Sequence, residues 1–370
     1  MLYIHIPYCH HKCTYCGFYS VAGRRDTEPY VDALCRELVA RKTDKPLKTI
    51  YFGGGTPSVL TARQLARIVQ TIGENYNLSQ LEEVTLEANP ENLTTEYLTD
   101  LADMHFFNRL SIGIQSFDDA ELHLLNRVHN SHQARQAVAD AADAGFGNIS
   151  VDLIMGLPGQ TAEAWQRNLD ALAELLTISA VKHLSCYELT LEPGSILERQ
   201  IAQGRVALAD DDTLAAQYAL LLEWCAANGF EQYEVSNFSR PGFHSRHNSR
   251  YWNRTPYIGA GAAAHSFDGT VRRWNLPDVE QYIAGAASGQ IPFEEERLTP
   301  DDAYNEYVMT ALRTVEGIDK AMVAEPYRKG LAEKIQPFVS KALVTETPTH
   351  YRPTPSGLLR ADGIAVALFA

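Results

Sequence analysis

The sequence lacks any run of apolar residues long enough to cross a membrane. A membrane-spanning helix needs about 20 consecutive apolar residues, and the longest apolar runs of this chain fall well short of that. The opening residues MLYIHIPYC also lack the basic segment and apolar stretch of a secretory signal. We therefore expect a cytoplasmic protein whose thiols stay reduced.

Cysteine and basic residues are both scarce. Six cysteines in 370 residues make a poor disulfide framework, and clustered cysteines in a reducing compartment indicate metal ligands or catalytic groups. Lys and Arg total 32 against 46 Asp and Glu, a formal net charge of −14. That balance argues against indiscriminate binding to nucleic acid or anionic lipid. The length suits one large domain and a smaller one.

Short β-rich runs alternate with amphipathic helical segments through the first 230 residues. Strands are predicted for residues 2–6, 48–54, 82–88, 108–115, 148–156 and 181–189. Helices are predicted for 27–41, with Thr27 as N-cap, and from Thr61, Asn92, Ser131, Thr161 and about Asp211. Successive β–α units predict a parallel sheet, either a partial (β/α)6 barrel or a doubly wound open sheet. In both, ligands bind at the C-terminal ends of the strands.

The composition changes near residue 235. Residues 235–267 contain no Asp or Glu, and arginines and histidines recur along them. From about residue 298 a helical pattern returns, followed by a probable hairpin within residues 342–363. We therefore divide the chain into a barrel domain, 1–235, and a smaller α+β domain, 236–370. In the latter, a linking segment, 236–297, precedes a helical, winged-helix-like part, 298–370.

Three cysteines lie in one loop after the first predicted strand. Cys9, Cys13 and Cys16 supply three thiolates, one fewer than a closed tetrahedral site requires. Soft thiolates at this density suit zinc or an iron–sulfur cluster. A zinc site would be completed by His10, His11 or a distant cysteine, whereas a four-iron cluster on three cysteines keeps one iron open for a ligand. Cys35, Cys186 and Cys225 are most simply buried small hydrophobic residues.

This cysteine loop and the GGGTP segment at 53–57, each after a predicted strand, resemble the signature of the radical S-adenosylmethionine (SAM) superfamily. The resemblance implies a [4Fe–4S] cluster on the three cysteines, with SAM bound at the open iron. Glycine backbone N–H groups, with no Cβ in the way, could approach the SAM carboxylate or amine closely.

The resemblance narrows to the coproporphyrinogen oxidase-like branch and covers essentially the whole chain. Followed residue by residue, it implies that Tyr3 and Tyr15 flank the cluster and SAM. It implies that the rest of the SAM pocket is formed by Gly54, Gly55, Thr56, Glu87, Gln115, Arg127 and Asp152.

Two features make the chain more similar to the HemW group of heme chaperones than to the oxidases of that branch. Phe18 stands where the oxidases carry a further cysteine, and HNSRYW at 247–252 matches the group's H-N-x-x-Y-W motif. We expect His247 to be a candidate axial ligand of heme iron, and Tyr251 and Trp252 to stack on the porphyrin. The flanking arginines could pair with the propionates, chiefly Arg246 and Arg250.

The resemblance thus implies a protein that binds heme and delivers it to acceptor hemoproteins, plausibly of the respiratory chain. Two alternatives stay open: an oxygen-independent coproporphyrinogen III oxidase, and a radical SAM enzyme that modifies RNA or another substrate. No catalytic residue is assigned, and SAM cleavage is left open. No nucleic-acid partner is expected, and peripheral membrane contact and a homodimer are both compatible with the sequence.

Overall fold

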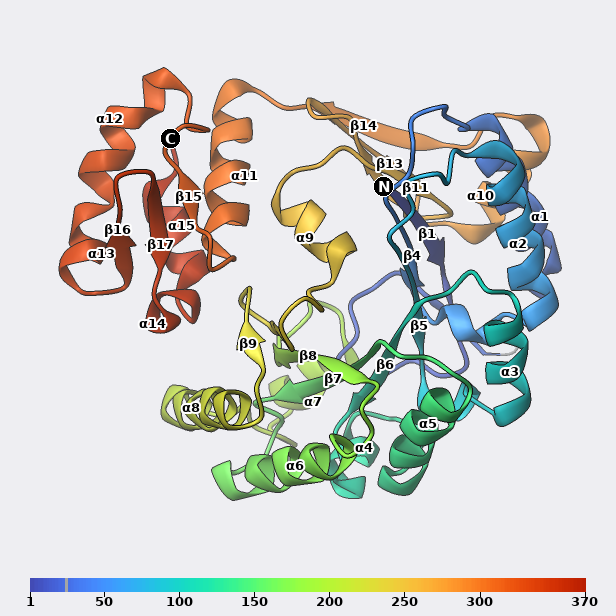
Figure 1. Cartoon of the computed structure of the whole chain (residues 1–370), viewed down its shortest axis with the longest axis horizontal. Coiled ribbons are helices and arrows are strands. Elements are labelled where there is room, and N and C mark those ends of the chain that lie inside the picture. The colour runs from blue at the N-terminus through green and yellow to red at the C-terminus, as the bar shows by residue number, and fades with distance from the viewer. Residues whose placement is uncertain (24–25) are drawn as a thin grey trace.

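The computed structural model describes residues 1–23 and 26–370, and its largest feature is an open nine-stranded sheet (Figure 1). The strand order is β11-β1-β4-β5-β6-β7-β8-β10-β9, and the strands from β11 to β8 run parallel. The bounds are β1 Leu2–Ile6, β4 Thr49–Gly54, β5 Glu83–Ala88, β6 Arg109–Gln115, β7 Ile149–Met155, β8 Val181–Glu188, β9 Glu231–Gln232, β10 Asn237–Ser239 and β11 Ile258–Ala260. The six predicted strands are therefore confirmed, and the sheet is a partial (β/α)6 barrel.

Two short helices, α4 Asp119–Leu124 and α7 Ile196–Ala202, lie in the loops after β6 and β8, and the Leu197 N–H of α7 donates to the Thr14 carbonyl of the cysteine loop at 2.9 Å. The longer helices cover the outer face of the sheet (Figure 1): α1 Glu28–Ala40, α2 Ala62–Asn75, α3 Thr95–Asp103, α5 Ser131–Asp143, α6 Ala162–Leu175 and α8 Asp211–Ala227. Burial of their apolar faces against the strands is the main stabilising contribution. The fully buried Trp165 of α6 shows the fit, because its Nε1 donates to the carbonyl of Gln217 on α8 at 3.0 Å.

One predicted helix cap is confirmed in position but lacks its capping hydrogen bond. Thr27 is the N-cap residue of α1, but its side chain makes no hydrogen bond to the first turn. Its Oγ1 instead accepts from Nε2 of Gln64 at 2.8 Å. Gln64 also closes the capping box of α2, since its Oε1 accepts from the backbone N–H of Thr61. The tertiary contact between α1 and α2 therefore replaces the local cap.

Residues 236–297, predicted as a linking segment, are folded mainly against the barrel. They contribute β10 and β11 to the large sheet, and also α9 Arg246–Trp252, α10 Val279–Ser288, β12 His265–Phe267, β13 Val271–Asn275 and β14 Phe293–Arg297. The main hydrophobic core extends from Leu2 to Ala286, and a second core from Tyr304 to Leu368. The two hydrophobic cores thus separate between Ala286 and Tyr304, and the domain boundary at residue 235 stays a prediction.

The second core belongs to a C-terminal lobe at the upper left of Figure 1. It contains α11 Pro300–Leu312, α12 Glu325–Lys334, α13 Gln336–Ser340, α14 Pro355–Leu358 and α15 Ala361–Leu368, with a small sheet of β15 Ile318–Asp319, β16 Val344–Glu346 and β17 His350–Pro353. The predicted hairpin is β16–β17. Glu306 of α11 fastens the lobe to the rest by ion pairs with Arg254 at 3.3 Å and Arg272 at 2.6 Å.

Candidate functional site

The loop with the three clustered cysteines follows β1 and is held by the loop after β6. Two short strands, β2 Tyr8–Cys9 and β3 Val21–Ala22, pair at its base. Thr14 anchors its middle, because its N–H donates to the Leu125 carbonyl at 3.1 Å and its Oγ1 to the Leu124 carbonyl at 3.0 Å. All three thiols remain partly exposed. The loop is therefore fixed at its back and open at the cysteine side.

A chain of hydrogen bonds joins two of the cysteine sulfurs through the ends of β4 and β5. Thr56 Oγ1 donates to Cys9 Sγ at 3.4 Å, and Asn89 Nδ2 donates to Thr56 Oγ1 at 3.2 Å. Arg127 completes it, with Nη2 on Asn89 Oδ1 at 2.7 Å and Nη1 on Cys13 Sγ at 3.4 Å. Loops far apart in the sequence thus converge on one pair of thiols.

The glycine segment after β4 packs directly against the cysteine loop. Gly54 has φ +109°, and a Cβ there would lie 2.5 Å from His5 Cε1. A Cβ at Gly55 would lie 2.7 Å from the Tyr8 carbonyl oxygen. The N–H groups of Gly54, Gly55 and Thr56 all have acceptors within the protein, namely the Glu87 carboxylate and the carbonyls of Ile6 and Tyr8. The glycines therefore permit a close approach of two loops.

Glu87 occupies the interior of the barrel beneath this segment. Tyr51 OH donates to its Oε1 at 2.7 Å, and Gly54 N–H donates to its Oε2 at 3.3 Å. Burial raises the pKa of the Glu87 carboxyl to about 7. Tyr3 stacks on Tyr51 at 6.2 Å between ring centroids. A buried carboxylate with a partner at each oxygen is well placed to accept a hydrogen bond from a polar ligand.

Asp152 and Gln115 lie on the neighbouring strands β7 and β6. Asp152 accepts hydrogen bonds from Ser111 and Ser150 at 3.0 and 3.1 Å, and burial raises the pKa of its carboxyl. Gln115 has φ +71° at a register shift of β6 against β7. A left-handed non-glycine residue at a strand end is a strained conformation typical of binding sites. Tyr15 packs beside them in a small apolar cluster of its own.

The predicted heme residues lie on α9, between the barrel and the C-terminal lobe (Figure 1). His247 is fully buried, with Nδ1 2.9 Å from Thr49 Oγ1 and Nε2 3.1 Å from Tyr251 OH. Burial lowers the pKa of His247 to about 3. Glu83 holds the start of the helix by accepting from the backbone N–H of Arg246 and His247. Both ring nitrogens of His247 therefore have partners in this conformation.

The arginines and aromatic residues of this motif are more accessible. Arg246 and Arg250 both pair with Glu82, at 2.8 and 3.5 Å. Tyr251 and Trp252 line a cavity of about 180 Å³, whose wall also contains Arg254, Phe267, Arg272, Glu306 and Met309. The cavity lies where α9 meets α11, at the boundary between the two hydrophobic cores.

Comparison with known proteins decides the family. The radical SAM superfamily profile matches residues 3–172, and the HemN C-terminal domain profile matches residues 298–360. The heme chaperone HemW of Lactococcus lactis is 38% identical over 85% of this chain and 82% of that protein. The heme chaperone HemW of Bacillus subtilis is 35% identical over 94% and 92%. The chain belongs to the HemW family.

A solved structure agrees with the HemW fold. Escherichia coli coproporphyrinogen III oxidase (HemN), a radical SAM enzyme, has a TM-score of 0.85, covering 100% of this chain and 89% of its own. Its sequence is only 24% identical, so this likeness shows the fold alone. Phe18, the predicted HemW mark, is 71% exposed next to the cysteine loop.

The radical SAM family implies a [4Fe–4S] cluster and SAM, and the residues present fit both. The donor set is three partly exposed cysteines of one loop, and in a cluster each thiolate would bind its own iron. Cys9, Cys13 and Cys16 would hold it, with hydrogen bonds to two of the sulfurs tuning the cluster. When bound, cluster and SAM supply one-electron chemistry.

Three site residues escape sequence reasoning. Tyr51 orients Glu87, and Asn89 bridges Thr56 and Arg127. Glu83 fixes α9 although it lies at the start of β5, far from that helix in sequence. Asn89 stands in the EANP segment that drew attention to Glu87, so its position at a strand end was the available signal. Nothing in the sequence indicates that Glu83 contacts α9.

Proposed function

We propose that this chain binds heme and passes it to acceptor hemoproteins while holding a [4Fe–4S] cluster and SAM. The observation that carries the proposal is the position of the HNSRYW motif. It forms α9 at the junction of barrel and C-terminal lobe, beside a cavity with aromatic rings and arginines. Aromatic faces suit a porphyrin plane, and arginines suit propionates. The curated relatives are named heme chaperones.

Heme would meet Tyr251 and Trp252 first. The cavity beside them, about 180 Å³, is small for a tetrapyrrole, so heme binding would separate α9 from α11. Axial ligation by His247 would further require its ring to leave Thr49 and Tyr251. In the closed conformation His247 instead orients Tyr251. A site that opens to load and closes on release suits transfer better than permanent storage.

The acceptor would be a hemoprotein, and respiratory-chain acceptors would bring the chain to a membrane surface. Among the described residues, no helix is long and apolar enough to cross a membrane. Any membrane contact in this proposal is therefore peripheral or made through the acceptor. A homodimer also stays a proposal.

The experiment combines two assays on one anaerobically reconstituted sample. Heme titration should give saturable binding that weakens about tenfold in Trp252→Ala, through loss of an aromatic stacking face. Trp274→Ala is the matched control, because Trp274 stacks on His265 of the β12–β13 sheet instead. Coproporphyrinogen III with SAM should give no decarboxylated product. Protoporphyrinogen formation would contradict the chaperone proposal in favour of an oxidase.

A further inference from the structure

A second, larger cavity lies at the C-terminal end of α1, away from the cluster loop and from α9. Its volume is about 530 Å³, within the range of small-molecule sites. It opens between α1, the end of α10, and the sheet of β13 and β14. Helix α1 begins at Glu28 and the cavity lining begins at Arg36, so the cavity starts about 12 Å along the helix from its N-terminal end. Helices α1 and α10 lie side by side at the right of Figure 1, far from the C-terminal lobe.

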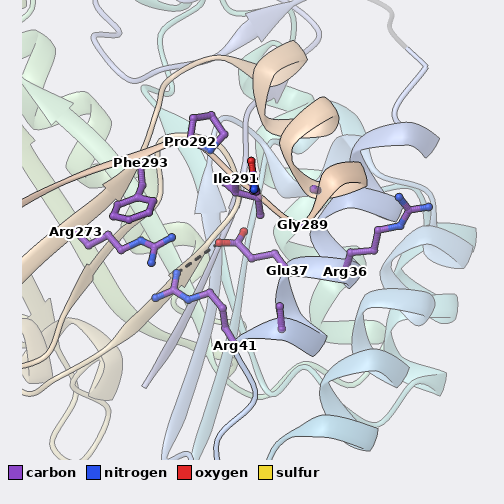
Figure 2. Close-up of a pocket in the computed structure, with 11 residues that line it drawn as sticks. Arg36, Glu37, Arg41, Arg273, Gly289, Ile291, Pro292 and Phe293 are labelled. Atoms are coloured by element: carbon purple, nitrogen blue, oxygen red, sulfur yellow. Dashed lines mark hydrogen bonds and ion pairs between the residues drawn. The ribbon is translucent and has the colours of Figure 1, made fainter.

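Positive charge dominates this cavity. Arg36, Arg41 and Arg273 line it together with one carboxylate, Glu37. Figure 2 shows Arg41 and Arg273 pointing toward one another and toward Glu37, whereas Arg36 points away. The Glu37 carboxylate is already used: it accepts from Tyr282 OH at 2.6 Å, Gly261 N–H at 2.8 Å and Asn275 Nδ2 at 2.9 Å. Arg41 Nη1 also pairs with Glu37 Oε1 at 3.5 Å (Figure 2). The one carboxylate therefore pairs with Arg41, and no carboxylate forms an ion pair with Arg273 within 4 Å among the described residues.

Arg41 is fixed in place while Arg273 has no acceptor. Arg41 donates to the Gly259 carbonyl at 2.5 Å and to Ser266 Oγ at 2.9 Å. The Nε of Arg273 is buried with no hydrogen-bond partner anywhere in the described chain. Its cross-strand neighbour Glu295 forms no ion pair with it within 4 Å among the described residues. A buried unpaired donor costs free energy that an acceptor from a ligand would recover.

The remaining wall is apolar. The Arg273 guanidinium lies 3.5 Å from the centroid of the Phe293 ring, which fixes its plane. Ala40, Ala286, Ile291 and Pro292 complete the lining. Burial and the nearby Arg41 lower the pKa of Arg273, yet an arginine stays charged at neutral pH. The cavity thus combines the Arg273 guanidinium, beside the Arg41–Glu37 ion pair, with an adjoining apolar wall.

We propose that this cavity binds a small organic anion with an apolar or aromatic body and one carboxylate or phosphate group. The anionic group would lie between Arg41 and Arg273 and accept from the free edge of Arg273. The body would lie against Ile291, Pro292 and Phe293. This site is separate from the heme and SAM sites, so its ligand would act as a regulator or a second substrate of the same protein.

The test titrates the full-length protein with benzoate, phenyl phosphate, benzamide and inorganic phosphate by calorimetry. We expect one equivalent of benzoate or phenyl phosphate to bind. The probe with the higher affinity shows whether the site prefers a carboxylate or a phosphate group. Neutral benzamide should bind at least tenfold more weakly, because it lacks the charge that the arginines recognise. Inorganic phosphate should also bind at least tenfold more weakly, since it lacks the apolar body.

Two variants test whether the probes bind in this cavity. Arg273→Gln should weaken the better probe about tenfold or more, and Ala40→Trp should block it by filling the exposed mouth without changing the charge. Arg63→Gln on α2 is the matched control, because Arg63 is exposed and outside the cavity. Circular dichroism spectra and melting temperatures show that each variant is folded.

Binding lost in Arg273→Gln and Ala40→Trp but kept in Arg63→Gln supports the proposal. Absence of binding by every probe at millimolar concentration overturns it, as does binding that survives both cavity variants. Heme titration of the same variants should be unchanged. A parallel loss of heme affinity would overturn the claim of a separate site without deciding whether the protein is a heme chaperone.

Discussion

Replacing His247 by alanine should lower the stability of the folded protein, independently of any effect on heme binding. The side chain is 0% exposed and contacts Thr49 Oγ1 and Tyr251 OH. Losing two hydrogen bonds costs about 1–3 kcal/mol, and leaving the buried Thr49 hydroxyl unpaired adds about 1–3 kcal/mol. We expect a total loss of about 2–6 kcal/mol in the free energy of unfolding, and a fall in melting temperature of roughly 3–8 °C for a chain of 370 residues.

The contribution of the His247 side chain to the free energy of unfolding should decrease as the pH falls. Burial lowers the pKa of His247 to about 3 from an ordinary 6.5. The folded state therefore resists protonation, and this stability is complete above pH 6.5 and is lost as pH falls toward 3. The difference in melting temperature between the parent and His247→Ala should shrink from pH 7 to pH 5.

Differential scanning fluorimetry over this pH range, followed by heme titration well below both melting temperatures, separates structure from ligation. His132→Ala is the control, because His132 is exposed on α5, and its effect should stay within about 0.5 kcal/mol. A His247→Ala protein that is as stable as the parent but loses heme binding would contradict the structural role of His247. His247 would then be an iron ligand that contributes little to the fold.

Three further perturbations follow from the site and its surroundings. Gly54→Ala should lower the melting temperature, because the backbone φ of +109° and a Cβ 2.5 Å from His5 Cε1 add about 1–3 kcal/mol of strain or more. The control is Gly73→Ala, an open helical position, which should raise the free energy of unfolding by about 0.5–1 kcal/mol. Arg127→Gln should weaken SAM binding about tenfold in anaerobic equilibrium dialysis if Arg127 pairs with the SAM carboxylate, and unchanged affinity would remove that role. Burial raises the pKa of Glu234 to about 7, so its ionisation opposes folding as pH rises from 4.5 through 7; melting curves should show Glu234→Gln gaining stability relative to the parent from pH 5 to pH 8, and a constant difference would contradict this.

The barrel strands were predictable because parallel strands buried on both faces are near-continuous apolar runs. Strands such as 149–155 and 109–115 therefore appear directly in the sequence. The sheet of β12 to β14 was not predictable. Strand β14, FEEER, is exposed throughout, and it pairs with β13, where Arg272 faces Glu296 and Arg273 faces Glu295. Cross-strand partners decide such strands, and no local pattern reveals them.

The candidate site was predictable where it follows strand ends. Cys9, Thr56 and Glu87 each lie at or shortly after the end of a buried strand, and parallel strands bring their C-terminal ends to one edge. Asp152 lies instead in the middle of β7. The burial of His247 was not predictable. Its segment is rich in arginine and has no carboxylates, a composition typical of an exposed segment. The ring is buried by contacts with Thr49 and Tyr51, which lie about 200 residues earlier in the sequence.

Heme transfer to an acceptor, as opposed to heme storage, can be measured directly for this HemW-family protein. Anaerobically reconstituted protein is loaded with one equivalent of heme and mixed with increasing concentrations of an apo-hemoprotein acceptor, and transfer is followed by absorbance. We expect a transfer rate that rises with acceptor concentration and exceeds the spontaneous heme release measured with an excess of apomyoglobin as scavenger. A rate equal to spontaneous release at every acceptor concentration would contradict it.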